Sequence, residues 1–275
     1  MDVQSLAFRT DLAILGLAGA EVEDQGSRLV VRSPTNPAYY WGNFYLLDRP
    51  PAADEVDVLV AAYDADFPDS AHRAFGVDGT GDQRDALAPL VAAGPELDAG
   101  TVMTATAVHP PPRPSPDADY RMFVSDEDWV QRVEVAVAVN DEHEPAAYLD
   151  FAARKAAHDR SICDAGHGAW WGAFVDGRLA SVMGIVDARG GLARYQSVET
   201  HPELRGRGLA GTLVHRVGSY ALEERGAETL VMVADPDYLA IRIYRSVGFN
   251  DTEVQAQLQQ HGRGPATPGT SSGHG

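Results

Sequence analysis

The apolar residues of the C-terminal half change their spacing at Pro202, and this change restricts the fold more than any other feature of the sequence. Before Pro202, strand-like patterns occupy residues 170–175, 178–187 and 192–200. Asp176-Gly177 between the first two segments is a hairpin signal. We therefore predict an antiparallel meander, preceded by a helix at about 145–163.

Beyond this point, apolar residues recur at helical spacing over residues 209–224. A buried strand at 229–234, a second helix at 237–247 and a final strand from Phe249 follow. The order of meander, helix, strand, helix and strand predicts an α/β (α+β) fold, in which helices flank a mixed, mostly antiparallel sheet.

The turn between the third strand and the next helix reads His201-Pro-Glu-Leu-Arg-Gly-Arg-Gly-Leu-Ala-Gly211. Glycines at a helix N-terminus let an anion approach unpaired backbone N–H groups, and the helix dipole favours negative charge there. Arg205 and Arg207 add positive charge. The turn is therefore a candidate phosphate-binding loop, and the alternative is a glycine turn with a purely structural role.

The same glycines, Gly206, Gly208 and Gly211, also fit the spacing of the dinucleotide fingerprint, with Asp235 as the ribose contact. In a dinucleotide-binding fold, however, the first glycine follows a buried parallel strand almost directly. Here residues 201–205 intervene, and the preceding strands are joined as hairpins. These differences disfavour the dinucleotide interpretation and leave NADH as the second ligand to test.

Two motifs resemble those of the GNAT superfamily of acyl-CoA transferases. Arg205-Gly-Arg-Gly208-Leu-Ala210 matches the family's Arg/Gln-x-x-Gly-x-Gly/Ala loop. Tyr244-Arg-Ser-Val-Gly-Phe249 matches the end of a later helix, Tyr-x-x-x-Gly-Phe. The resemblance covers residues from about 118 to 258 and implies an N-acetyltransferase that uses acetyl-CoA as cosubstrate and a primary amine as acceptor.

The resemblance also implies which residues bind the cofactor. In the family the glycine loop holds the pyrophosphate of coenzyme A, and the end of the strand before it pairs with the pantetheine arm. A backbone N–H at that strand end faces the thioester oxygen. The matching positions are Val198, Glu199, Thr200, Arg205, Gly206, Arg207, Gly208, Leu209, Ala210 and Gly211. Asp237 replaces a frequent family asparagine and is expected to cap the second helix, which leaves its contact with the cofactor open.

Tyr244 and Glu199 are the candidate catalytic residues. The resemblance implies that Tyr244 protonates the departing thiolate, and a phenol with an ordinary pKa of about 10 suits that role. The alternative for Tyr244 is a core aromatic on the helix face. Glu199 is the carboxylate nearest the cofactor strand and is the candidate general base, with a solvated strand residue as the alternative.

Prolines are concentrated at residues 109–117, which favours an extended connection and places a domain boundary there. We predict tandem domains at 1–117 and 118–258, followed by a disordered tail at 259–275. The first domain repeats the order of strand, loop and helix without the glycine loop, and we interpret it as a degenerate GNAT-like copy. Its aromatic run at 37–45 lines a substrate cleft or packs between the domains.

The composition limits the partners that we expect. A net charge of −18 disfavours nucleic acid and anionic membranes and favours cationic small molecules. No segment approaches the roughly 20 apolar residues that cross a bilayer, and the N-terminus lacks a signal peptide, so we expect a cytoplasmic protein. The single cysteine and the spacing of the histidines indicate neither a disulfide framework nor a metal site.

Two functional hypotheses follow. The first is an enzyme that aligns a neutral primary amine of a small metabolite or a protein against acetyl-CoA for direct attack. The second is a non-catalytic acyl-CoA-binding sensor or interaction protein. Tyr244 favours the enzyme, because binding alone does not need the phenol. Both a monomer and a homodimer are compatible with the sequence.

Overall fold

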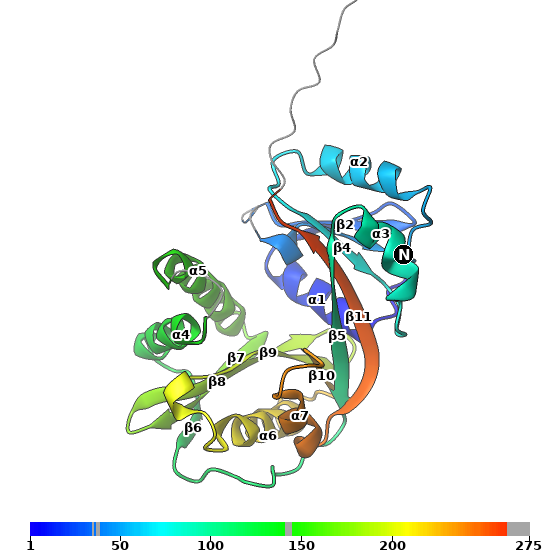
Figure 1. Cartoon of the computed structure of the whole chain (residues 1–275). Coiled ribbons are helices and arrows are strands. Elements are labelled where there is room, and N and C mark those ends of the chain that lie inside the picture. Colours follow the sequence, from blue (N-terminus) through cyan, green and yellow to red (C-terminus); the bar gives the residue numbers. More distant parts are fainter. Residues whose placement is uncertain (35, 37–38, 141–144, 263–275) are drawn as a thin grey trace, which may run out of the picture. The chain divides into compact units, whose positions relative to one another are not determined.

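The computed structural model describes residues 1–262 except 35, 37–38 and 141–144, and Figure 1 shows its elements. The chain divides into two compact units. Unit 1 contains Met1–Phe8, Gly19–Gly100 and the residues from Val254, and unit 2 contains Arg9–Ala18 and Thr101–Glu253. The units therefore change at Gly100 and at Glu253, whereas the sequence places its boundary at 109–117.

Unit 2 is built around a mixed sheet with the strand order β5-β10-β9-β8-β7-β6. Neighbouring strands are antiparallel except β9 and β10, which are parallel. Its elements after β5 (Glu96–Ala105) are β6 (Asp119–Met122), α4 (Asp126–Val139), α5 (Pro145–Asp164), β7 (Gly168–Val175), β8 (Arg178–Ala188), β9 (Leu192–Thr200), η3 (Pro202–Leu204), α6 (Leu209–Glu223), β10 (Thr229–Ala234) and α7 (Ile241–Val247).

This arrangement confirms the predicted fold class and the predicted meander, which forms β7, β8 and β9. The sequence analysis did not predict β6 or α4. A signal for α4 is present, because Ser125 and Asp128 form a capping box at its start. The predicted helix at 237–247 is shorter in the structure, where α7 begins at Ile241.

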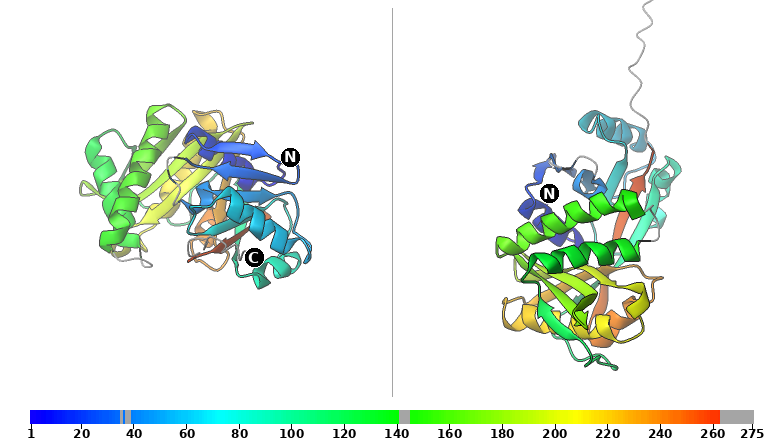
Figure 2. Two further views of the ribbon diagram at one scale, coloured as in Figure 1. Left: turned by 90° about the horizontal axis from the view of Figure 1, so that it is seen from above. Right: turned by 90° about the vertical axis from the view of Figure 1, so that its left-hand side faces the viewer.

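The two faces of this sheet carry separate apolar cores. On one face, Leu213 and Val217 of α6 and Val247 of α7 pack with Met183 and Tyr195 of the sheet. On the other face, residues of α4 and α5 pack with β7 and β8, and Figure 2 shows these two green helices side by side. The second core contains Val135, Ile162, Trp170, Phe174, Leu179, Val182 and Val186. The sheet is therefore covered by helices on both faces.

The proline-rich segment at 109–117, which the sequence predicts as an extended connection, packs against α6 within unit 2. The Ser115 N–H donates to Thr212 Oγ1 at 2.9 Å, and the Tyr120 hydroxyl donates to the Ser115 carbonyl at 3.0 Å. A Cβ at Gly208 would lie 2.5 Å from the Arg113 carbonyl oxygen. The segment thus contacts the first turn of α6, and Gly208 leaves room for it.

Unit 1 contains the strand order β1-β2-β3-β4-β11, in which only β3 and β4 are parallel among the described pairs. Its elements are α1 (Leu6–Leu17), which begins in unit 1 and continues into unit 2, β1 (Glu21–Asp24), β2 (Arg28–Arg32), η1 (Tyr40–Gly42), β3 (Phe44–Leu47), α2 (Val56–Asp66), β4 (Arg73–Val77), η2 (Asp85–Leu87), α3 (Ala88–Ala92) and β11 (Asn250–Gln260). β1 and β2 form an antiparallel hairpin that turns at Gln25-Gly26.

The aromatic run predicted at 37–45 contributes to unit 1 in two ways. Tyr45 is buried in the core, where it packs with Tyr63 and Phe75. Tyr40 stacks on His72 with ring centroids 3.8 Å apart. At the other end of the chain, Gln259 and Gln260 still belong to β11, and the rest of the predicted tail from residue 263 lies outside the described residues.

Candidate functional site

The parallel strands β9 and β10 pair only over the first three residues of each. The ladder joins Leu192 to Thr229 and ends with Arg194 opposite Val231. Farther along, β10 remains paired with β5 while the end of β9 remains paired with β8. The two strands therefore diverge toward their carboxyl ends. Between them lies a cavity of about 240 Å³, lined by residues 195–198 and 232–235 and by side chains before and within α7.

A bulge interrupts β9 at the mouth of this cavity. Val182 of β8 lies opposite Glu199, and Gly184 lies opposite Gln196, so that Met183 faces two residues of β9. Ser197 within the bulge has a φ of 48°, in the left-handed region. A side chain in that region costs on the order of 1–3 kcal/mol, and such strain is often found at functional sites.

The bulge decides which face of the sheet Glu199 occupies. Side chains alternate along a regular strand, so Glu199 would share a face with Tyr195, whose hydroxyl donates to the Val214 carbonyl of α6 at 3.0 Å. Instead, Val198 packs with the core on the α6 side. Glu199 lies opposite Val182, which belongs to the core under α4 and α5. The extra residue has therefore moved Glu199 to the opposite face.

Glu199 is a partly buried carboxylate with an unusual environment. Its Oε2 atom is buried and has no hydrogen-bond partner among the described residues. Burial raises the pKa of Glu199, the positive charges of Arg132 and Lys155 lower it, and Asp159 raises it. The shielded oxygen disagrees with the alternative of a solvated strand residue. A carboxylate with a raised pKa is a suitable proton acceptor near neutral pH.

Tyr244 contacts the cavity from the opposite side, on α7. It is 7% exposed and belongs to the core between α6, α7 and the sheet, so the alternative of a core aromatic also describes its packing. Burial raises the pKa of Tyr244 to about 12, with a smaller contribution from Tyr238. The phenol therefore keeps its proton at neutral pH and remains available as a donor.

The glycine loop leads directly into α6. Gly206 and Gly208 both have a φ of 77°, which glycine adopts without steric cost. Gly208 is the N-cap of α6, and no side chain caps the helix there. Arg205 donates from Nε to the Thr200 carbonyl at 3.2 Å, while Arg207 is exposed. The first N–H groups of α6 and these two arginines together form a candidate anion site.

The remaining loop residues divide between the core and the loop surface. Leu209 and Gly211 are buried, and a Cβ at Gly211 would lie 3.2 Å from Pro111. Ala210 is only half-buried. The Leu209 side chain therefore serves packing and Gly211 leaves room for Pro111, so only the backbone of these two residues is suited to contact a ligand.

The expected helix cap at Asp237 is wrong. The N-cap of α7 is Ala240, and Asp237 lies in a turn in which its N–H donates to Asp235 Oδ1 at 2.8 Å. Asp237 is exposed, whereas Asp235 and Tyr238 line the cavity. From the sequence, Asp235 was considered only as the ribose contact of the dinucleotide alternative, and Tyr238 and Gln196 of β9 were missed. The turn before α7 could not be distinguished from a helical turn by spacing alone.

Metal-binding clusters and membrane-spanning helices are considered for the described part of the chain, residues 1–262 with its gaps. Among its residues, no group of three or more His, Cys, Asp or Glu is placed to hold a metal ion. None of its helices has the length and apolar character that crossing a membrane requires.

Diverging parallel strands beside a glycine-bearing helix N-terminus define a domain that can hold an extended, phosphate-containing ligand across a sheet. Residues 136–249 match the family model described as "Acetyltransferase (GNAT) family". The chain therefore contains a GNAT-family domain, and the family is one of acyl transferases.

Solved structures share the fold over most of the chain. A functionally unknown conserved protein from Staphylococcus epidermidis is 13% identical, with a TM-score of 0.69 over 89% of this chain and 95% of that chain. A GCN5-related N-acetyltransferase from Kribbella flavida is 16% identical, with a TM-score of 0.64 over 94% and 96%. A tandem GNAT protein from the clavulanic acid biosynthesis pathway is 17% identical, with a TM-score of 0.56 over 87% and 83%.

Proposed function

We propose that unit 2 is an N-acetyltransferase that moves an acetyl group from acetyl-CoA to a primary amine. The observation that carries this proposal is the divergence of β9 from β10 beside the uncapped N-terminus of α6. In the proposal, the α6 N–H groups, Arg205 and Arg207 hold the pyrophosphate. The pantetheine arm lies in the cavity and pairs with the end of β9.

The two substrates approach the gap from opposite faces of the sheet. Tyr244 lies on the α6 and α7 side, and Glu199 lies on the α4 and α5 side. A thioester that enters along α6 therefore meets Tyr244, and an amine that enters beside α4 and α5 meets Glu199. This separation assigns the acid to the leaving thiolate and the base to the acceptor.

The reaction is a direct transfer. The lone pair of the neutral acceptor nitrogen forms a bond to the thioester carbon, and Glu199 takes the proton that the nitrogen then loses. The backbone N–H of Val198, next to the bulge, stabilises the resulting oxyanion. The carbon–sulfur bond then breaks, and Tyr244 gives its proton to the thiolate. Proximity of the aligned amine and thioester supplies much of the remaining acceleration.

Unit 1 supports a second part of the proposal, that it is a degenerate GNAT-like copy without a cofactor site. The segment β3-α2-β4 repeats the order of β9-α6-β10, with parallel strands joined by a helix. Here the strands stay together, because the Asp78 N–H donates to the Leu47 carbonyl at 2.8 Å. Before α2, Glu55 accepts the Ala52 N–H at 2.7 Å and pairs with Arg49, and no glycine loop precedes the helix.

Calorimetric titration with acetyl-CoA tests binding. The exposed double variant Arg205→Glu/Arg207→Glu should weaken binding at least tenfold, and Arg189→Glu, exposed on the β8–β9 turn, is the matched control. Gly208 is unsuitable for this test, because a side chain there would meet the Arg113 carbonyl. We expect one acetyl-CoA per chain. Two per chain would contradict the proposed loss of the site in unit 1.

An assay of thiol release over a panel of primary amines tests catalysis. Amine-dependent release by the wild-type protein would support the transferase. Binding without release for every amine would favour a sensor that holds acyl-CoA, and absence of binding would overturn the cofactor assignment, with NADH as the next ligand.

A further inference from the structure

A buried cluster of charged side chains lies on the α4 and α5 side of the sheet. Arg132 of α4 and Asp159 of α5 are 2% and 3% exposed, and Arg132 Nη2 lies 2.9 Å from Asp159 Oδ2. Lys155 Nζ lies 3.0 Å from Asp159 Oδ1, and the Lys155 side chain is 34% exposed. Burial of such ions is costly, and a buried ion pair often contributes little net stability. The cluster therefore calls for another explanation.

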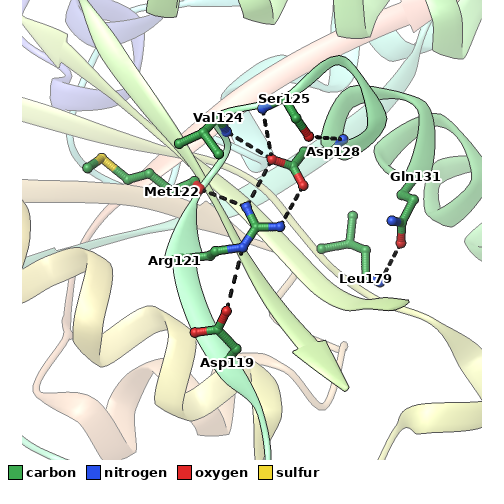
Figure 3. Close-up of polar contacts among 8 residues, drawn as sticks. All are labelled: Asp119, Arg121, Met122, Val124, Ser125, Asp128, Gln131 and Leu179. Carbon is green, nitrogen blue, oxygen red and sulfur yellow. Dashed lines mark hydrogen bonds and ion pairs between the residues drawn. The ribbon is translucent and has the colours of Figure 1, made fainter. Parts of the chain in front are cut away.

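The position of Arg132 is fixed by the start of its own helix. Figure 3 shows the Asp128 carboxylate at the first turn of α4, where it accepts both Arg121 Nη2 at 2.7 Å and Arg121 Nη1 at 2.9 Å. The same carboxylate accepts the N–H groups of Val124 and Ser125. Asp128 lies one helical turn before Arg132, on the same face of α4. The network therefore anchors the turn that carries Arg132.

A second contact ties this helix to the sheet. The Leu179 N–H of β8 donates to Gln131 Oε1 at 2.7 Å, as Figure 3 also shows. Gln131 immediately precedes Arg132, and β8 is the strand that pairs with the end of β9. The guanidinium of Arg132 is thus held in place relative to the strand that carries Glu199.

Arg132 and Glu199 each retain an unused polar atom in this region. Arg132 Nε and Glu199 Oε2 are both buried without a hydrogen-bond partner among the residues that the structure describes. Glu199 reaches this face only through the bulge at Ser197. Around Glu199, the charged groups of α4 and α5 that act on its carboxyl are Arg132, Lys155 and Asp159. The first two favour the ionised carboxylate, and Asp159 opposes it.

We propose that Arg132 and Lys155, held by Asp159, are positioning residues that keep the partly buried Glu199 ionised and aimed at the acceptor amine. The inference rests on the proposed function of Glu199 as the base. It assigns a role to a cluster that does not touch the cofactor cavity. Without these positive charges, the pKa of the Glu199 carboxyl would rise further, and a smaller fraction of it would be ionised and able to accept a proton from the amine.

The pH dependence of kcat/KM for the acceptor amine tests this role, measured with saturating acetyl-CoA. Lys155→Met should move the acidic limb to higher pH by about half a unit to one unit, because it removes a positive charge. Asp159→Asn should move the limb in the opposite direction. Arg154→Met is the matched control, because Arg154 is the adjacent cation on α5 and its partner is the exposed Asp150. The acidic limb of Arg154→Met should not move.

Opposite shifts from two partners of one ion pair would not arise from a merely structural role, which predicts lower activity with an unchanged limb. Unchanged limbs in both variants would overturn the inference. Lys155 is partly exposed, so Lys155→Met keeps the test available if Asp159→Asn does not fold.

Titration of Glu199 itself gives a second readout that does not depend on turnover. A carboxyl-carbon NMR titration identifies the Glu199 resonance as the one that is missing in Glu199→Gln, and Lys155→Met should raise its midpoint by a similar amount. If Glu199→Gln keeps the acidic limb, the proposed base is wrong. A second outcome separates the two proposals. If Glu199→Gln loses the acidic limb, but Lys155→Met and Asp159→Asn leave both the acidic limb and the NMR midpoint of Glu199 unchanged, only the role of the cluster is wrong.

Discussion

Val198 and Glu199 are consecutive in the sequence and lie on faces of the sheet that the regular alternation of β9 would not give them. Val198 packs with the core on the α6 side, and Glu199 faces the core under α4 and α5. The left-handed backbone of Ser197 just before them sets this arrangement. One inserted residue therefore determines which substrate the candidate base can meet.

Substitutions at Ser197 test this conclusion. Ser197→Gly should keep the bulge and raise the free energy of unfolding by up to about 1 kcal/mol, because glycine adopts the left-handed region without strain. Ser197→Val should lower it by about 1–2 kcal/mol and reduce kcat, because a β-branched residue resists that backbone. Urea denaturation and steady-state kinetics measure both effects. Equal stability and activity in the two variants would contradict a role for the bulge.

Removing the hydroxyl of Tyr244 should affect the chemical step. Tyr244→Phe keeps the packing and should lower kcat by roughly 100-fold, within the range for loss of a general acid, with little change in the affinity for acetyl-CoA. Tyr238→Phe is the matched control, because Tyr238 lines the same cavity and is 57% exposed. Because burial raises the pKa of Tyr244 to about 12, the wild-type rate should not fall between about pH 8 and 10 through loss of this proton. Unchanged kcat in Tyr244→Phe would leave Tyr244 as a core aromatic.

Glu199 should lower the free energy of unfolding near neutral pH, where it is proposed to act as the base. Its raised pKa means that the folded protein binds the proton more tightly than the unfolded chain does. Stability from this group is therefore greatest below its ordinary pKa and declines as the pH rises through the raised value. Glu199→Gln should raise the free energy of unfolding at pH 7 by about 1 kcal/mol, and the difference should shrink toward pH 4. Denaturant titrations at both pH values measure it, and a destabilised variant at pH 7 would be the opposite of this expectation.

Asp128 should show the reverse pH dependence. The hydrogen bonds from Arg121 and then those from the backbone N–H groups hold its pKa well below the usual range, despite burial. Its contribution is present above the ordinary carboxyl pKa and is lost as the pH falls toward the lowered value. Asp128→Asn should cost about 2 kcal/mol at pH 7, because it weakens both the helix cap and the ion pair. The same denaturant titration at pH 3 should give a smaller difference between the two proteins, whereas an equal difference would exclude this linkage.

Two glycines of the loop distinguish backbone strain from steric contact. Gly206 and Gly208 have the same φ of 77°, yet a Cβ at Gly206 would be free of contacts, and a Cβ at Gly208 would lie 2.5 Å from the Arg113 carbonyl. Gly206→Ala should cost about 1 kcal/mol through strain alone. Gly208→Ala should cost at least about 1 kcal/mol more, because the proline-rich segment must move. Thermal unfolding of both variants measures the difference, and equal Tm values would indicate that the segment is loosely held.

The sequence predicts much of unit 2 because its signals are local. The spacing of apolar residues is sufficient for the meander, α6 and β10, and the glycines mark the turn before Leu209. The face of Glu199 cannot be predicted in this way, because a bulge depends on the register of β9 with Met183 on the neighbouring strand β8 and not on the spacing within β9. The same limit applies to Arg132, whose partner Asp159 belongs to a different helix. Asp237 was misplaced because three residues of turn before α7 resemble a helical start.

The pairing of β5 with β10 has a practical consequence for dissecting this protein. Residues Thr101–Ala105 of β5 hydrogen-bond to β10 on the side opposite β9, although they precede the proline-rich segment. A fragment that begins at residue 118 would expose the backbone of β10 as an unpaired edge strand, and such edges promote aggregation. Insolubility of that fragment would therefore report the loss of one strand, and a fragment of unit 2 that keeps β10 paired on this side must include Thr101–Ala105.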